Sequence, residues 1–221
     1  MSLDEAVTVA NSGRRQTGIE AALTLIGRPF EVIEGATWEH DPQILARVRA
    51  VNPLVQIPAV ALPSGEIMTE SGAILIWLAD AHPGARLGPA IDDPRRGQFL
   101  RWMTYIPASI YSMFWVRDEP SRLAGPDKAA GDRVKVATAE RIADCWRMMD
   151  QQITPAGDYL LGDEISVLDL YVAVVSRWGP GRNRFYREAP GMTPVVRRVD
   201  ADPRLATFWA ERFPFAEGWE R

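Results

Sequence analysis

The residues best suited to binding chemistry lie between Ile57 and Ser71. Glu70 and Ser71 stand at the predicted start of a helix, where unpaired backbone N–H groups and the helix dipole favour an anion. Pro58 precedes an apolar run, so it suits the start or edge of a strand. If the Ile57-Pro58 bond is cis, Ile57 turns its own N–H and C=O toward a ligand. These residues predict a site for one small anionic molecule.

The motifs Asn52-Pro53, Gln56-Ile57-Pro58 and Thr69-Glu70-Ser71, followed by an amphipathic helix, resemble the glutathione-binding half of the cytosolic glutathione S-transferases. The resemblance points to a bacterial type and leaves the subclass open. It implies that Ile57, beside Pro58, pairs its backbone with the cysteinyl part of glutathione. Glu70 would then contact the γ-glutamyl ammonium group and Ser71 the carboxylate. The alternative is that Glu70 and Ser71 only cap the helix.

The same resemblance places the catalytic donor between the first strand and the first helix. A free thiol titrates at about 8.5, and a nearby hydroxyl donor or helix N-terminus favours the thiolate. Ser12 is the only hydroxyl in the loop from Asn11 to Arg15, and we expect it to donate to the sulfur. It lies about one residue before the family's usual serine position, and it could instead be the helix N-cap. Asn11 is the second candidate, through its side-chain amide.

Arg15 is the remaining candidate in this loop. Arginines at a helix start oppose the helix dipole, and a bound anion would offset that cost. We therefore include Arg15 among the glutathione contacts, with a solvated side chain as the alternative.

The first part of the chain alternates strands and helices. We expect a strand over 6–10, a helix over 15–26, a strand over 30–33, a helix over 41–51, a hairpin over 59–69 and a helix from near Ser71. This βαβ unit, single helix and ββα unit predict an α/β domain similar to the thioredoxin fold over residues 1–81.

A segment rich in Pro, Gly and Asp follows at residues 82–94 and predicts a linker. Residues 95–221 show long helical patterns over 94–116, with a kink at Pro107, and over 128–154. Ser166 and Asp169 have the spacing of a capping box, which resembles the buried one of the transferase helical domain. We expect an all-α domain here.

Aromatic side chains make the helix over 94–116 the predicted wall of an electrophile site between the domains. Trp102, Tyr105 and Tyr111 suit apolar electrophiles, although aromatic residues at helical spacing also fit a core. A second charged segment follows Gly179-Pro180-Gly181 and contains Arg182, Arg184 and Arg187. We expect a solvated charged turn there, and the alternative is a mobile loop that favours an acidic substrate.

Composition excludes several classes of function. The net charge is −4 with both signs dispersed, so we expect no nucleic-acid partner. Cys145 is the single cysteine, and no run is apolar enough to span a bilayer, so we expect a reduced, soluble, cytoplasmic protein without a membrane partner. His40 and His82 lack metal-ligand spacing, which predicts no metal. Without a dinucleotide or phosphate loop we expect no permanently bound cofactor, only glutathione as co-substrate.

These observations predict a detoxifying glutathione transferase that delivers the thiolate to a small apolar electrophile. The resemblance also implies a homodimer. The alternative function is a non-catalytic binding or interaction module with the transferase fold.

Overall fold

The computed structural model describes residues 7–11, 17–62, 64–153, 155 and 157–215. The amino-terminal half contains a four-stranded sheet in the order β2-β1-β3-β4, in which β1 is parallel to β2 and antiparallel to β3. This is the thioredoxin-like α/β arrangement predicted from the sequence. The elements of this half are β1 (Val7–Asn11), α1 (Thr17–Ile26), β2 (Phe30–Glu34), η1 (Thr37–Glu39), α2 (Pro42–Val51), β3 (Ala59–Ala61), β4 (Ile67–Thr69), α3 (Ser71–Ala81) and η2 (Pro83–Ala85).

Local signals set the bounds of the first two helices. α1 ends before Gly27, whose φ of 75° is readily adopted by glycine. Asp41 is the N-cap of α2, and its carboxylate accepts a hydrogen bond from the backbone N–H of Gln43 at 2.7 Å. Pro42 occupies the first helical position, where a missing N–H costs nothing. Both helices therefore form where the sequence predicts them.

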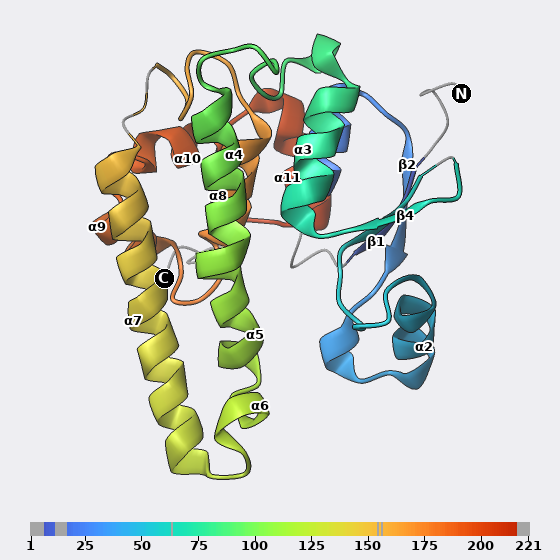
Figure 1. Cartoon of the computed structure of the whole chain (residues 1–221), viewed down its shortest axis with the longest axis vertical. Coiled ribbons are helices and arrows are strands. Elements are labelled where there is room, and N and C mark those ends of the chain that lie inside the picture. Colours follow the sequence, from blue (N-terminus) through green and yellow to red (C-terminus); the bar gives the residue numbers. More distant parts are fainter. Residues whose placement is uncertain (1–6, 12–16, 63, 154, 156, 216–221) are drawn as a thin grey trace.

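The carboxyl-terminal half is helical, as predicted. Figure 1 shows α3 between this half and the sheet. The helices are α4 (Arg96–Tyr105), η3 (Ile106–Tyr111), α5 (Ser112–Asp118), α6 (Ser121–Ala124), α7 (Lys128–Gln152), α8 (Val167–Val175), α9 (Arg182–Glu188), α10 (Thr193–Asp200), η4 (Pro203–Leu205) and α11 (Ala206–Arg212).

Pro107 lies in a π-helical segment, η3, between α4 and α5. Proline has no N–H to donate, so an α-helical hydrogen bond is missing at this position. A wider π turn is one way in which a helix accommodates such an interruption. The single long helix predicted over 94–116 is therefore divided into three segments.

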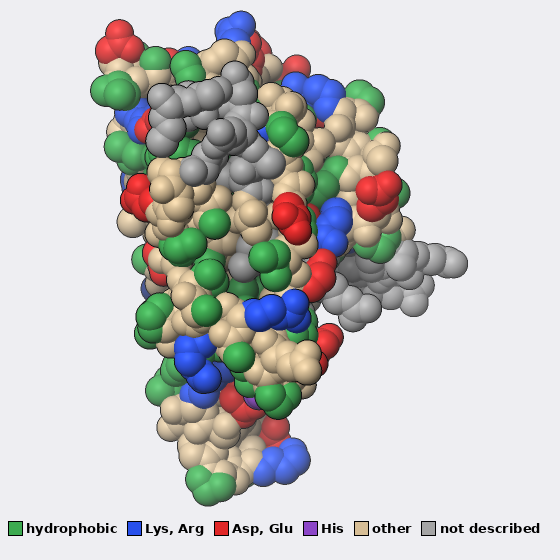
Figure 2. All heavy atoms as spheres, turned by 90° about the vertical axis from the view of Figure 1, so that its right-hand side faces the viewer, with side chains coloured by type: hydrophobic (Ala, Val, Ile, Leu, Met, Phe, Trp, Pro, Cys, Tyr) green, Lys and Arg blue, Asp and Glu red, His purple; other side chains and the backbone are tan. Residues whose placement is uncertain are grey.

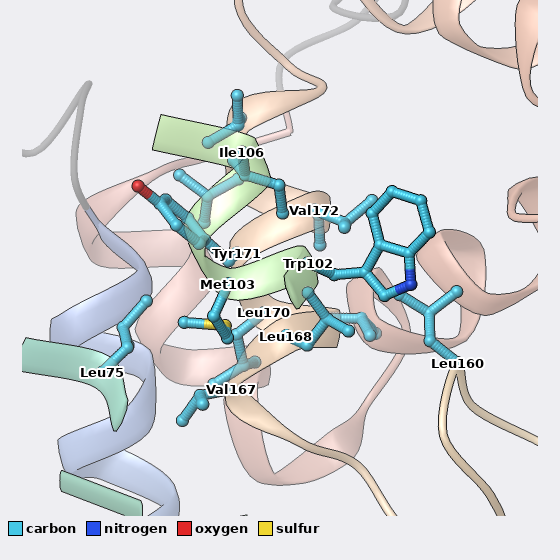
Figure 3. Close-up of a cluster of buried hydrophobic side chains, with 14 of the residues drawn as sticks. Leu75, Trp102, Met103, Ile106, Leu160, Val167, Leu168, Leu170, Tyr171 and Val172 are labelled. Atoms are coloured by element: carbon cyan, nitrogen blue, oxygen red, sulfur yellow. The ribbon is translucent and has the colours of Figure 1, made fainter. Parts of the chain in front are cut away.

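The capping box at the start of α8 is present. The Asp169 carboxylate accepts hydrogen bonds from the backbone N–H groups of Ser166 at 2.8 Å and Leu160 at 2.9 Å. Burial raises the pKa of Asp169 to about 6. α8 runs through the centre of the helical half, and Figure 3 shows its side chains packed against Trp102 and its neighbours. The box thus anchors the central helix.

The prediction of a solvated turn is wrong for Arg182. Residues Arg182–Glu188 form α9, and the Arg182 side chain is fully buried. Its guanidinium pairs with Asp200 at 2.7 Å and donates to the carbonyl of Ala173 at 2.7 Å. These acceptors replace water around the buried charge.

The described surface carries dispersed charge. On the face shown in Figure 2, basic and acidic side chains are interspersed among hydrophobic and uncharged ones. Within the described residues, no helix is long and apolar enough to cross a membrane.

Candidate functional site

The strand register brings the two predicted binding motifs together. Ala59 of β3 pairs with Thr69 of β4. Ile57 and Pro58 come just before that pair and Glu70 and Ser71 just after it, so all four lie at one end of the β3-β4 ribbon. We call these four residues the ribbon-end site. Their approach follows from antiparallel pairing, because residues flanking a matched pair on the same side are neighbours.

The loop after β1 begins at the same end of the sheet. Ala10 of β1 pairs with Ala59, and the backbone of Asn11 pairs with Glu34 of β2. Ser12 and Arg15 lie outside the described residues, as does the Asn11 side chain. The structure therefore places the start of their loop beside the ribbon-end site and leaves their roles as predictions.

The turn before Ile57 is held by the side chain of Asn52. Its amide donates to the carbonyl of Gln56 at 2.9 Å, and its side-chain oxygen accepts from the N–H of Leu54 at 3.1 Å. Val55 within this turn has a φ of 54°, which is unusual for a β-branched residue. The Ile57-Pro58 bond is cis. Asn52 thus fixes the segment that leads into the ribbon-end site.

Glu70 has an unusual backbone conformation at the start of α3. Its φ is 68° and its ψ is 105°, outside the small left-handed region open to non-glycine residues. Its carbonyl accepts the first helical hydrogen bond from Ile74 at 2.9 Å, but its exposed side chain makes none to the helix. Glu70 therefore occupies the N-cap position of α3 through its backbone, and its side chain does not cap the helix. Its carboxylate stands at the surface beside Ser71.

Ser71 is the first residue of α3, and its hydroxyl reaches across to the helical half. Its Oγ lies 2.6 Å from the hydroxyl of Tyr171 in α8, and both residues are buried. The N–H groups of the first turn of α3 have no partners within the helix, so they and the dipole favour an anion here. A narrow crevice adjoins this pair, lined by Gly18, Ile19, Ser71, Leu75, Tyr171, Val174 and Trp178.

Comparison with known proteins decides the family. The uncharacterized GST-like protein YncG of Escherichia coli (strain K12) is 30% identical over 186 residues, which are 84% of this chain and 88% of that protein. The chain belongs to the glutathione S-transferase family. Residues 17–81 also match the family model for the glutathione S-transferase N-terminal domain.

Two further similar proteins have lower sequence identity. Glutathione S-transferase GstA of Escherichia coli O157:H7 is 26% identical over 129 residues, which cover 58% of this chain and 60% of that protein. The crystal structure of a glutathione transferase homologue from Sulfitobacter, with bound glutathione, superposes with a TM-score of 0.78 at 22% identity, over 93% of this chain and 97% of that one. This likeness shows the shared transferase fold.

The aromatic residues predicted for the electrophile site of this transferase-family chain lie in different surroundings. Trp102 is fully buried, and Figure 3 shows it within the core, so it has no surface for a substrate. The Tyr105 ring packs edge-on against Trp102 at 5.4 Å, and its hydroxyl donates to the carbonyl of Cys145 at 3.3 Å. Tyr111 lies 5.1 Å from Trp178, which lines the crevice. Tyr111 therefore contacts a residue that lines the crevice.

Two crevice residues were missed in the sequence. Tyr171 and Trp178 belong to the apolar stripe of α8 and its end, where the periodicity predicts core residues only. For Tyr171 the hydroxyl was the available signal, because a buried hydroxyl requires a partner. That partner, Ser71, could not be identified from the local sequence. The Trp178 indole N–H is buried without a hydrogen-bond partner among the described residues.

Proposed function

We propose that this protein binds glutathione at the ribbon-end site and transfers its thiolate to a small apolar electrophile. Residues 1–81 would supply the glutathione site and residues 95–221 the electrophile site, with 82–94 as linker. The register that brings Ile57 beside Glu70 and Ser71 is the observation that carries the proposal. Membership of the transferase family supports it.

Each group of the ribbon-end site suits a different part of glutathione. The main chain of Ile57 would pair with the cysteinyl residue, beside Pro58. The exposed carboxylate of Glu70 would attract the γ-glutamyl ammonium group, and Ser71 with the first N–H groups of α3 would hold the adjacent carboxylate. The bound glutathione of the Sulfitobacter homologue supports a ligand of this kind.

The chemical step needs a donor that stabilises the thiolate. We assign this role to Ser12, with Asn11 as the second candidate and Arg15 as a further glutathione contact. Sulfur would attack the electrophilic carbon, forming a C–S bond while the leaving group departs with its electron pair. GstA, a transferase by name, is the relative that supports this reaction class.

The electrophile would lie against the aromatic residues near the crevice. Tyr111 and Trp178 form a tilted ring pair, and Phe114 packs edge-on to Trp178 at 5.2 Å. Such a surface favours apolar and aromatic substrates. We further propose that two copies of the chain associate, as the resemblance implies.

Retention on immobilised glutathione tests the binding proposal. The wild type should be retained, and the Glu70→Ala, Ser71→Ala double variant should pass through. The matched control is Ser64→Ala with Glu66→Ala, which removes the same two residue types from exposed positions at the opposite end of the ribbon. If the wild type were not retained on immobilised glutathione, the proposal of glutathione binding would be refuted.

Turnover of a chloronitrobenzene tests the chemistry. Ser12→Ala should abolish most activity while the protein still binds immobilised glutathione. Full activity in Ser12→Ala would refute the assignment of the donor. Glutathione binding without turnover of any test electrophile would instead support a non-catalytic module.

A further inference from the structure

The hydrogen bond between Ser71 and Tyr171 joins the ribbon-end site to the helical half. The two residues are separated by 100 positions, and their oxygens lie 2.6 Å apart. Tyr171 is 2% exposed and Ser71 is 6% exposed. Ser71 is also the residue that we propose as the donor to the glutathione carboxylate. Its hydroxyl must therefore serve the ligand and Tyr171 together.

Ser71 has a single hydroxyl proton, and this decides the direction of its hydrogen bond with Tyr171. A serine hydroxyl has one proton and two lone pairs, whereas a carboxylate offers acceptors only. If Ser71 donates its proton to the carboxylate, its lone pair must accept from Tyr171. Burial holds the pKa of the Tyr171 phenol above its usual range, so the phenol keeps its proton and can donate.

Packing holds the Tyr171 hydroxyl in place. Figure 3 shows its ring within the core cluster and its oxygen pointing away from Trp102. On the other side, α3 approaches closely at Gly72, where an added Cβ would lie 3.0 Å from the carbonyl oxygen of Met103 and 3.9 Å from the Tyr171 ring. A side chain so confined can orient its partner without loss of rotamer freedom on binding.

We infer that Tyr171 is a positioning residue of the glutathione site, which directs the Ser71 proton toward the γ-glutamyl carboxylate. This inference rests on the proposed function. It makes the helical half a participant in recognition of the glutathione carboxylate, in addition to its proposed contact with the electrophile. The competing explanation is that the Ser71–Tyr171 hydrogen bond only stabilises the packing of the two halves and does not affect glutathione binding.

A pair of ligands separates these explanations. One ligand is glutathione, and the other is its analogue without the γ-glutamyl α-carboxylate, 4-aminobutanoyl-cysteinyl-glycine. Calorimetry should show that Tyr171→Phe weakens glutathione binding about fivefold, the effect of one hydrogen bond. The analogue should bind the wild type and Tyr171→Phe equally, because it lacks the group that Ser71 would hold.

Equal glutathione affinity of the wild type and Tyr171→Phe would overturn the inference, as would an equal loss for both ligands. The matched control is Tyr186→Phe, which removes a hydroxyl that accepts a 3.2 Å hydrogen bond from Arg182 elsewhere in the helical half. It should leave both affinities unchanged. If the wild type bound neither ligand, the proposed function itself would fail.

A second comparison covers the case in which Tyr171→Phe does not fold. Removing both partners of a buried hydrogen bond is tolerated better than removing one, so Ser71→Ala with Tyr171→Phe should fold. The double variant should bind glutathione with the same affinity as Ser71→Ala, because Tyr171 acts only through Ser71. A further loss in the double variant would contradict that role.

Discussion

Arg212 of α11 forms an ion pair with Glu20 of α1, in which Nε of Arg212 lies 2.6 Å from Oε2 of Glu20. The Glu20 side chain is fully buried, whereas Arg212 is 26% exposed and also pairs with Glu34 at 2.9 Å. The pair connects the end of the helical half to the sheet half. It is one of the ion pairs that join the two halves, as is the pair between Arg96 of α4 and Asp80 of α3.

Arg212→Met should lower the free energy of unfolding by about 3 kcal/mol, because it removes a main partner of a buried carboxylate. Urea denaturation measures this change. The matched control is Arg86→Met, which breaks a 2.6 Å pair with Glu164 between side chains that are 72% and 49% exposed. That loss should stay below about 1 kcal/mol. Equal effects of the two variants would contradict a structural role for the Arg212 pair.

The buried carboxyl of Asp169 should make stability depend on pH. Burial raises the pKa of Asp169 from 3.8 to about 6 in the folded protein. At a pH between these two pKa values, the folded state therefore binds more protons than the unfolded state. The free energy of unfolding then falls as the pH rises through this window. Relative to Asp169→Asn, the wild type should therefore lose stability from about pH 4 to about pH 6.

Urea denaturation across this pH range measures the Asp169 effect. The control is Asp132→Asn, since the hydrogen bond from Lys128 lowers the pKa of Asp132 and gives the opposite sign. A wild-type advantage over Asp169→Asn that grew with pH would refute the prediction.

The sequence predicted the features that depend on local signals. The Asn52-Pro53 turn, the hairpin and the Ser166–Asp169 box are each set by residues close together in the chain, and all are present. Backbone sterics and caps act over a few residues, so their outcome can be worked out without the fold.

Long-range partners could not be predicted in the same way. Arg182 is buried because Asp200 and the Ala173 carbonyl come to it from other helices. The Ser71–Tyr171 bond likewise depends on how α3 packs against α8. Periodicity places Tyr171 on an apolar face but does not show which polar group meets its hydroxyl. Such contacts become visible only when the two halves are assembled.

Tyr111 should affect the electrophile more than glutathione. Tyr111→Leu removes the ring that packs 5.1 Å from Trp178. The KM for a chloronitrobenzene should rise about threefold to tenfold, as expected for loss of an aromatic contact, while the KM for glutathione stays unchanged. Steady-state kinetics with each substrate varied in turn measures both values. The control is Tyr159→Leu, at a half-buried tyrosine whose ring lies against Arg198, which does not line the crevice. An equal effect there would refute the prediction.

Gly72 should be required for the close packing of α3 against the helical half. A Cβ at this position would lie 3.0 Å from the Met103 carbonyl oxygen and 3.4 Å from Pro107, so Gly72→Ala must displace backbone or ring atoms. We expect a loss of about 1–3 kcal/mol in the free energy of unfolding, typical of overpacking. Because Ser71 is the neighbouring residue, glutathione affinity should fall as well.

Gly97→Ala in α4 is the matched control for Gly72→Ala. An added Cβ there meets no atom within 4 Å, so the substitution should stabilise the helix by about 0.5–1 kcal/mol. Thermal and urea denaturation give the stabilities, and calorimetry gives the glutathione affinities of both variants. If Gly72→Ala were as stable as Gly97→Ala and bound glutathione as tightly, the contact between α3 and the helical half would not control the position of Ser71.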